Sequence, residues 1–528
     1  MSDADDVRET DLFVIGGGVN GAGIARDAAG RGLSVVLCEK DDLAQGTSSR
    51  SGKLVHGGLR YLEHYEFRLV REALIEREVL LESAPHIIWP MRFVLPHSPL
   101  DRPAWLIRLG LFLYDHLGGR RRLPGTRALD LRTAPEGAPL KSDYTKGFEY
   151  SDCWVDDARL VILNALDARE RGAEVLVRTR CTRARRDGGT WLVDTLEAGS
   201  GRIVRYRARA IVNAGGPWVS DIIGGVTGSN AARRIRMVKG SHLIVPKFWE
   251  GPQAYLVQNH DRRVIFINPY EGDKALIGTT DIPYEGEQEA VVAEQHEIDY
   301  LIDAVNRYFE VPLTRADVLE TFSGIRPLLD DEAENPSAVT RDYTFDLDRG
   351  PDDRNDRGGE DGRGGEGGRS GASAPMLSVF GGKITTFRKL AEHAMGKLRP
   401  CFPDMGPDWT RHATLPGGDM PDADFDAFLA RLRKTRPWLP DSLATHLARL
   451  YGTRAEAVLG GARSLDELGR RFGPDLHEAE ARYLREHEWA STAEDVLRRR
   501  TKHALHMNED EREAFRHWFE TGAERSAA

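Results

Sequence analysis

The chain has 528 residues, of which 73 are Lys or Arg and 83 are Asp or Glu, so its formal net charge is −10. A composition with 40% hydrophobic and 30% charged residues is that of a globular protein, and it excludes a wholly disordered or fibrous chain. The net acidity argues against nucleic acid as a partner. The four cysteines form no CxxC pair, which fits a reducing compartment and excludes a cysteine zinc site of the usual spacing.

The first 40 residues predict a β-α-β unit. Residues 12–15 form a short apolar strand, residues 22–31 form a helix of small side chains, and residues 33–38 form a second strand. A glycine-rich turn connects the first strand to the helix. The acidic residues before this unit include no apolar stretch, so we expect no secretory signal.

The glycine-rich turn carries a dinucleotide-binding fingerprint. Gly16, Gly18 and Gly21 fit the pattern G-x-G-x-x-G between a strand and a helix. The first glycine permits the tight turn, the second lets the backbone approach a pyrophosphate, and the third lets the helix pack on the strand. Glu39 ends the second strand, where an acid accepts hydrogen bonds from an adenosine ribose and disfavours NADP. The fingerprint alone does not separate NAD from FAD.

The region 60–120 is predicted to be mainly helical. Residues 104–117 form an amphipathic stretch that is too short and too charged to cross a bilayer. Such a helix is either buried in a domain or lies on a membrane surface. The sequence leaves both readings open.

The second half of the chain predicts a β-rich block followed by helices. Short apolar strands recur between turn signals at 241–245, 254–258, 264–268 and 275–278. Residues 349–374 are rich in Gly and charge, which predicts a disordered loop inserted in a hairpin between strands 341–346 and 376–380. After residue 400 the pattern is helical.

Two later segments favour FAD over NAD. Residues 210–218 and 378–389 each form a strand that runs into a Gly-Gly turn, and the second continues into a helix. The chain therefore returns to the nucleotide-binding domain near its C-terminal third. A long cofactor such as FAD needs this arrangement, because one helix N-terminus binds the pyrophosphate and another faces the flavin.

Seven segments spread along the chain have a recognisable sequence. They are IGGGVNGAGIAR at 15–26, GTSSRSGKLVHGGLRYLEHY at 46–65, GFEYSDCWVDD at 147–157, KGSH at 239–242, GTTD at 278–281, SGIRP at 323–327 and FGGKITT at 380–386. In these segments the chain resembles the FAD-dependent, membrane-associated glycerol-3-phosphate dehydrogenase family. The resemblance covers nearly the whole chain.

The resemblance implies an α/β fold of three parts. The first is a discontinuous, Rossmann-like FAD-binding domain of residues 1–75, 150–235 and 375–398. The second is an antiparallel-sheet substrate-binding domain of residues 76–149 and 236–348, followed by the disordered insertion 349–374. The third is an all-helical C-terminal domain of residues 400–528.

The resemblance also implies an activity. The family oxidises sn-glycerol 3-phosphate to dihydroxyacetone phosphate by hydride transfer from C2 to FAD, and passes the electrons to a membrane quinone. We therefore expect a cytoplasmic protein, peripherally associated with the inner face of the cytoplasmic membrane, for which a homodimer is compatible with the family. Two segments are predicted to contact the membrane: residues 104–117 with the basic run 120–122, and the basic run 498–502.

The resemblance assigns roles to individual residues. Arg60, Tyr61, Arg341 and Lys383 are predicted to bind the phosphorylated substrate, because cations clamp a phosphate dianion. His242, Arg326 and His56 are the predicted catalytic residues. His242 is the first choice of base, His56 is its rival, and Arg326 polarises the C2 oxygen. The predicted cofactor-binding residues are Gly16, Gly18, Gly21, Glu39, Thr47, Ser48, Ser49, Lys53, Gly57, Gly58, Gly215, Gly381, Gly382 and Thr385.

Three alternatives stay open at this point. A glycerol-3-phosphate oxidase would use O₂ in place of the quinone with the same reductive site. A flavin amine or amino-acid oxidase would need a carboxylate clamp, whereas the five cations inside the motifs suit a phosphate dianion better. These cations are Lys53, Arg60, Arg326, Arg341 and Lys383. A flavin-bearing sensor would lack the substrate cations. No metal ligands are predicted, because the histidines at 86, 97 and 116 lie at unrelated spacings.

Overall fold

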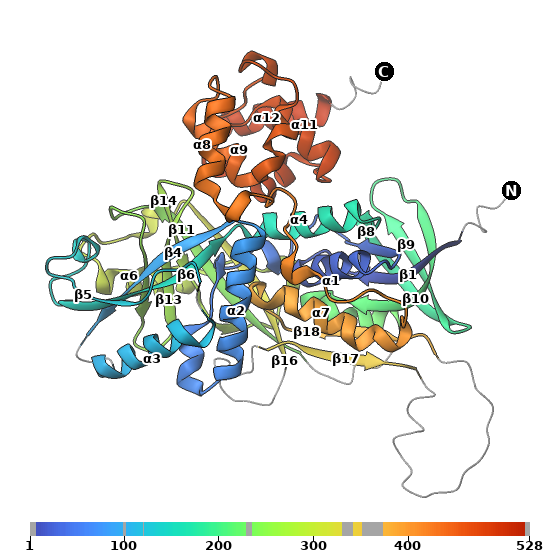
Figure 1. Cartoon of the computed structure of the whole chain (residues 1–528), viewed down its shortest axis with the longest axis horizontal. Coiled ribbons are helices and arrows are strands. Elements are labelled where there is room, and N and C mark those ends of the chain that lie inside the picture. Colours follow the sequence, from blue (N-terminus) through green and yellow to red (C-terminus); the bar gives the residue numbers. More distant parts are fainter. Residues whose placement is uncertain are drawn as a thin grey trace, which may run out of the picture.

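The computed structural model describes residues 7–98, 102–119, 121–228, 235–329, 342–350 and 373–522. Two β-sheets lie side by side, and a helical domain stands over one side of them (Figure 1). Arg341, predicted to bind substrate, and nearly all of the predicted insertion 349–374 lie outside the described residues.

The first sheet is the nucleotide-binding sheet predicted from the N-terminal motif. Its strand order is β17-β18-β10-β1-β2-β7, and β10 also carries the hairpin β8–β9. The pairs among β18, β10, β1, β2 and β7 are parallel. The bounds are β1 (Val7–Ile15), β2 (Val35–Cys38), β7 (Glu174–Leu176), β8 (Thr179–Asp187), β9 (Thr190–Glu197), β10 (Ile203–Asn213), β17 (Thr344–Asp348) and β18 (Met376–Phe380).

Helices cover the first sheet because its central strands are apolar on both faces. The strand β2 reads VVLC and is buried throughout. Helix α1 (Val19–Gly30) packs between α4 (Asp157–Glu170) and α7 (Phe387–Leu398) (Figure 1). The predicted β-α-β unit is confirmed, with its helix starting three residues earlier than expected.

The second sheet is mainly antiparallel, as predicted. Its order is β15-β11-β14-β13-β12-β4-β6-β3, with β16 paired to β11 and β5 paired to β6. The pair β12–β4 is parallel. The bounds are β3 (Leu54–Val55), β4 (Ile88–His97), β5 (Arg127–Asp130), β6 (Lys146–Val155), β11 (Ile235–Pro246), β12 (Ala254–Gln258), β13 (Val264–Tyr270), β14 (Lys274–Gly278), β15 (Ile282–Pro283) and β16 (Glu320–Leu329).

Three helices accompany the second sheet. They are α2 (Phe67–Ser83), α3 (Ala104–Leu117) and α6 (Gln295–Tyr308). Helix α6 has a strongly amphipathic pattern and buries Leu301 and Val305 against the sheet. Among the described residues, no helix has both the length and the apolar character needed to cross a membrane.

The C-terminal domain is helical and has its own hydrophobic core. Its described residues form helices and turns with one isolated bridge, Arg471 to His477. The principal helices are α8 (Phe425–Thr435), α9 (Asp441–Tyr451), α10 (Ala455–Leu459), α11 (Glu478–His487) and α12 (Glu509–Thr521). The shorter η15 (Asp495–Arg500) and η16 (His503–Leu505) lie between α11 and α12.

The structure differs from the predicted domain division at three strands. β3 and the second half of β6 belong to the second sheet, although 1–75 and 150–235 were assigned to the FAD-binding domain. β17 belongs to the first sheet, although 236–348 were assigned to the substrate domain. β17 forms an antiparallel ladder with β18, which confirms the predicted hairpin. Because β18 belongs to the first sheet, its hairpin partner β17 belongs there too.

Candidate active site

The turn after β1 has the geometry of a pyrophosphate-binding loop. Gly16 has φ +110°, a left-handed value, and a Cβ on Gly21 would overlap the Gly16 carbonyl oxygen. The first turn of α1 carries no acidic residue, and the N–H of Val19 donates to Ser48 Oγ at 3.0 Å. The predicted Gly16, Gly21 and Ser48 therefore meet at a helix N-terminus that favours an anion.

Glu39 lies beside this loop. Its carboxylate accepts the N–H of Gly17 at 2.7 Å and the N–H of Asp41 at 2.8 Å. Burial raises the pKa of Glu39, while these two backbone hydrogen bonds act to lower it. Each oxygen keeps a second lone pair, so the side chain is able to accept from a ribose as predicted.

A second glycine turn approaches the first one. Gly381 has φ +72° and Gly382 has φ +99°, and the short helix η9 (Ile384–Thr386) begins directly after Lys383. Asn20 of α1 donates to the Gly381 carbonyl at 3.1 Å. Its other amide atom, Oδ1, is buried without a hydrogen-bond partner among the described residues. An acceptor of this kind between two glycine turns fits a ligand that supplies a donor.

The ends of β10 and η1 complete the loop region. A Cβ on Gly16 would come within 2.5 Å of the Ala214 carbonyl oxygen, so the end of β10 packs directly on the turn. Gly215 donates its N–H to Asn213 Oδ1 at 3.2 Å. In η1 (Thr47–Ser49), Thr47 donates to the carbonyl of Ile325 at 2.6 Å. Since Ser48 of η1 also accepts from Val19, η1 connects the first glycine loop with β16 of the second sheet.

A cavity of about 430 Å³ opens between η2 (Leu59–His64), α3 and the second sheet. Five of the predicted site residues line it, and apolar side chains of α3 and of β12–β13 form much of the remaining wall. The five are His56, Gly58, Arg60, Tyr61 and Arg326. Residues that were predicted from separate motifs are thus brought to one cavity.

His56 links this cavity to the second glycine turn. Its backbone N–H donates to Thr385 Oγ1 at 3.1 Å. Thr385 is buried in η9. His56 therefore lies between the turn of Gly381 and Gly382 and the cavity that it lines.

Cations surround the same space. Lys383 Nζ lies 3.9 Å from the centre of the Tyr61 ring. Arg326 donates to the Thr280 carbonyl at 3.1 Å, and its Nη1 lies 2.8 Å from Asp281 Oδ1. Asp281 also lines the cavity. Sequence reasoning named the GTTD motif but gave no role to this acid.

His242 occupies a different place from the one predicted for a base. It is 5% exposed, and its ring stacks on Phe322 at 4.8 Å. It is not among the residues that line the 430 Å³ cavity. Burial, with Arg326 and Lys53 nearby, lowers the pKa of His242 to about 3, so its ring is neutral near pH 7.

Lys53 is held in an ion pair. Its Nζ lies 2.7 Å from Asp157 Oδ1 and donates to the Ser49 carbonyl at 3.1 Å. The residue is 3% exposed. The sequence predicted a cofactor contact for Lys53, whereas the geometry gives its ammonium group a partner on α4.

Tyr114 is a site residue that the sequence analysis did not name. Its hydroxyl donates to Asp152 at 2.8 Å and accepts the N–H of Gly57 at 2.8 Å. Arg77 Nη1 lies 2.7 Å from the same carboxylate. The buried side of α3 thus fixes Gly57 and its neighbour Gly58, which has φ +72°. The amphipathic pattern of residues 104–117 could have indicated Tyr114, because this residue lies on the buried side of the helix.

The other side of α3 is apolar and exposed. The apolar rim, as we call it, consists of Tyr65, Phe67, Trp105, Leu109 and Phe112, which are between 41% and 80% exposed. Three of its members, Tyr65, Phe67 and Leu109, also line the cavity. The predicted amphipathic helix therefore borders the entrance of the candidate site.

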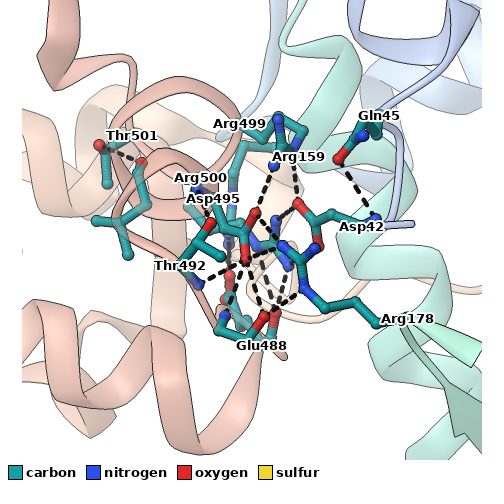
Figure 2. Close-up of polar contacts among 12 residues, drawn as sticks. Asp42, Gln45, Arg159, Arg178, Glu488, Thr492, Asp495, Arg499, Arg500 and Thr501 are labelled. Atoms are coloured by element: carbon teal, nitrogen blue, oxygen red, sulfur yellow. Dashed lines mark hydrogen bonds and ion pairs between the residues drawn. The ribbon is translucent and has the colours of Figure 1, made fainter. Parts of the chain in front are cut away.

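The second predicted membrane segment, 498–502, is wrong as an exposed basic patch. Arg499 Nε and Arg500 Nη1 each lie 2.5 Å from Asp42 Oδ2, and Arg500 is 0% exposed. Lys502 pairs with Asp156 and is buried. Figure 2 shows the pairs of Arg499 and Arg500 with Asp42, in a network to which Asp495, Arg178 and the pair Arg159–Glu488 also belong. The basic run docks the helical domain onto the nucleotide-binding sheet.

Comparison with known proteins identifies the family. The profile of the FAD dependent oxidoreductase family matches residues 11–345. This chain belongs to that family. The profile named for the C-terminal domain of alpha-glycerophosphate oxidase matches residues 409–525, which covers the helical domain.

Full-length relatives place the chain more closely. It is 66% identical over 510 residues to D-erythritol 1-phosphate dehydrogenase of Brucella abortus, with 97% of each chain covered. It is 50% identical over 508 residues to aerobic glycerol-3-phosphate dehydrogenase of Escherichia coli, covering 96% of this chain and 97% of the relative. The predicted membership of the glycerol-3-phosphate dehydrogenase family is confirmed.

A solved structure agrees with the fold. The glycerol-3-phosphate dehydrogenase from Bacillus halodurans, solved with FAD, superposes with a TM-score of 0.72 at 26% identity. The superposition covers 97% of this chain and 94% of that one. FAD is the cofactor of the family, and two glycine turns with a buried unpaired acceptor between them fit it. The predicted choice of FAD over NAD is confirmed.

Proposed function

We propose that this chain is a dehydrogenase that oxidises the secondary hydroxyl next to the phosphorylated carbon of a short polyol phosphate. The observation that carries the proposal is the convergence of His56, Arg60, Tyr61 and Arg326 on one cavity. The backbone N–H of His56 is hydrogen-bonded to Thr385, which follows the second glycine turn, so the cavity lies next to the turn proposed to face the flavin. FAD, when bound, supplies the acceptor of the hydride.

The residues of the cavity, with Lys383 beside Tyr61, have separable tasks. Arg60 and Lys383 hold the phosphate dianion, since Arg offers a planar fork and Lys a point charge. Arg326, oriented by Asp281, donates toward the hydroxyl oxygen that becomes negative. His56 takes the hydroxyl proton, because it lies in the cavity and histidine is the side chain that most often serves as a general base. This order reverses the sequence-based preference for His242.

sn-Glycerol 3-phosphate is the first candidate substrate. Two observations support it: the motifs that resemble the glycerol-3-phosphate dehydrogenase family, and the matching name of the Escherichia coli relative at 50% identity. Oxidation at C2 would give dihydroxyacetone phosphate. Arg341 and the remaining predicted cofactor residues stay predictions.

D-Erythritol 1-phosphate is the second candidate substrate. The observation that favours it is the 66% identity to the Brucella abortus enzyme, which exceeds the 50% to the Escherichia coli enzyme. The two molecules share a phosphorylated CH₂ and its neighbouring secondary hydroxyl, and erythritol phosphate is longer by one CHOH unit. A cavity of about 430 Å³ has room for either.

A membrane quinone is the proposed electron acceptor. The apolar rim beside the cavity supports it, because exposed apolar patches of this kind mark membrane or partner contacts. Arg102 and Arg108 on the same segment add positive charge that anionic headgroups attract. The apolar rim and these arginines are also the basis for proposing peripheral association with the inner face of the cytoplasmic membrane. A homodimer is proposed from the family resemblance.

Anaerobic mixing of the holoenzyme with each phosphate tests the assignment. We expect loss of flavin absorbance at about 450 nm with both or one of the two compounds, and kcat/KM ranks them. The reduced protein is then offered a quinone in phospholipid vesicles or, separately, O₂. Fast recovery with the quinone supports the dehydrogenase. Fast recovery with O₂ and release of peroxide would show an oxidase instead, and no bleaching with either phosphate would refute the proposed substrate class.

A further inference from the structure

Three side chains of the C-terminal domain meet far from the cavity. They are His446 of α9, Glu480 of α11 and His503 of η16. His446 Nε2 lies 2.7 Å from Glu480 Oε1, and His503 Nε2 lies 3.8 Å from Glu480 Oε2. One potential ligand atom from each residue falls within 4.8 Å of the other two. The three residues are widely separated in the sequence, so no spacing motif announces them.

Two polar atoms in this cluster face each other without a hydrogen bond. Glu480 Oε2 and His503 Nε2 are buried and make no hydrogen bond with any described residue, and their 3.8 Å separation is an ion-pair contact only if His503 is protonated. Glu480 is 2% exposed and His503 is 4% exposed. Buried polar atoms are nearly always satisfied, and an unpaired carboxylate oxygen is costly. A group that binds both atoms at once would remove this cost.

We infer that His446, Glu480 and His503 form a binding site for a divalent cation of the Zn²⁺ class. Zn²⁺ bonds to His nitrogen and carboxylate oxygen at about 2.0–2.2 Å, so two ligand atoms in a tetrahedral site lie about 3.4 Å apart. The separation of 3.8 Å between His503 and Glu480 needs only a small movement. Two imidazoles with one carboxylate suit Zn²⁺ better than Mg²⁺ or Ca²⁺, which prefer oxygen.

The surroundings support ligands rather than a simple ion pair. Tyr451 donates its hydroxyl to Glu480 Oε1 at 2.7 Å and so fixes the carboxylate, as partners behind metal ligands do. The side chain of His446 is 14% exposed, which gives the cation a path from solvent. A water molecule would complete a four-coordinate site. Binding requires both imidazoles as neutral ligands, so any proton shared between His446 and Glu480 is released to solvent.

The position of the cluster suggests what the cation does. η16 begins at His503, one residue after Lys502, which pairs with Asp156 of the nucleotide-binding part. Arg500 in the preceding turn pairs with Asp42 (Figure 2). A cation that joins α9, α11 and η16 would hold the docking segment to the helical domain. The site is therefore a structural one, separate from the cavity and from the flavin.

Zn²⁺ binding to the full holoenzyme is the direct test. The protein is stripped with a chelator, desalted, and titrated with Zn²⁺ alone or with Co²⁺ alone as a spectroscopic probe. We expect one tight equivalent, a four-coordinate Co²⁺ spectrum, and a Tm that rises with free Zn²⁺ concentration. None of these readouts depends on the substrate, so they stand or fall separately from the proposed activity.

Variants decide whether the bound ion occupies this cluster. Glu480→Gln and His503→Gln should lose the tight equivalent, while His517→Gln, at an exposed histidine of α12, should retain it. Tyr451→Phe is a milder variant for the case that Glu480→Gln does not fold, because it keeps the aromatic ring and removes only the hydroxyl. We expect it to weaken Zn²⁺ affinity by about 10- to 100-fold. The inference is wrong if the wild-type chain binds no tight equivalent, or if Tyr451→Phe and His517→Gln bind Zn²⁺ equally well.

Discussion

His56 and His242 differ in what surrounds them. His56 lines the cavity together with Arg60 and Arg326, whereas His242 is stacked on Phe322 and 5% exposed. A pKa lowered to about 3 makes His242 a weak base, because little driving force remains for taking a proton. Its neutral ring is better suited to accept or donate a fixed hydrogen bond.

Replacing these two histidines separates their roles. His56→Asn should slow flavin reduction by polyol phosphate by about 10²- to 10⁴-fold, the usual contribution of a general base, and should flatten its pH profile. His242→Asn should leave the shape of that profile unchanged, because a group with a pKa of about 3 does not titrate near neutrality. Rapid-mixing kinetics between pH 6 and 9 measure both. A profile flattened only by His242→Asn would return the role of base to His242.

For individual residues, the sequence identified the members of the site better than it ranked the two histidines as candidate bases. The motifs brought His56, Arg60, Tyr61 and Arg326 into consideration, and the fold unites them. The ranking of the two histidines depended on which one faces the cavity, and that follows from the pairing of β11 with β14 and β16. Strand register over such distances in sequence is not readable from local patterns.

Helix α3 and the basic run 498–502 show how local patterns mislead or succeed at the scale of elements. The amphipathic pattern of α3 holds in the structure, with Leu111 and Tyr114 buried and Trp105 exposed. The run of basic residues looked equally suited to a lipid surface. Arg499 and Arg500, however, pair with Asp42 (Figure 2), and the buried Lys502 pairs with Asp156. The acidic partners, Asp42 and Asp156, lie in the N-terminal half of the chain, so the local sequence around 498–502 could not predict the pairing.

The docking of η15 should depend on Asp42. This carboxylate is 0% exposed and pairs with both Arg499 and Arg500. Arg499 also pairs with Asp495, so Asp42→Asn leaves the buried Arg500 without an anionic partner among the described residues. We expect the free energy of unfolding to fall by about 3–5 kcal/mol. Urea titration measures it. Glu513→Gln, which removes an exposed partner of Arg516, should cost under about 1 kcal/mol, and equal losses for the two variants would contradict this view.

Across the whole molecule, the order of sheets and helical domain was predictable, and the exact borders were not. The glycine fingerprint and the later Gly-Gly turns announced a discontinuous nucleotide-binding domain, because each occurs where a strand meets a helix. The strand β17 crossed the predicted border, since a strand joins its hairpin partner wherever that partner lies. Long-range pairing of this kind sets domain limits more than composition does.

The molecule as a whole should be sensitive to acid because it buries neutral histidines. Burial lowers the pKa of both His86 and His242 to about 3, with neighbouring Arg side chains contributing. In the unfolded chain an ordinary histidine titrates near 6.5. Between about pH 6.5 and 3 the unfolded state therefore binds more protons than the folded state, and stability falls as the pH falls.

His86 is the better site for testing this because, unlike His242, it is not one of the predicted catalytic or binding residues. It is 0% exposed, packs against Gly417 and Gly452, and has no hydrogen-bond partner for either ring nitrogen among the described residues. Each such histidine contributes a slope of up to about 1.4 kcal/mol per pH unit. His86→Asn should reduce the pH dependence of the urea midpoint between pH 5 and 6.5, whatever its effect on stability at pH 8. The exposed His517→Asn should leave the slope unchanged, and an unaltered slope in His86→Asn would show that this ring is protonated in the folded protein.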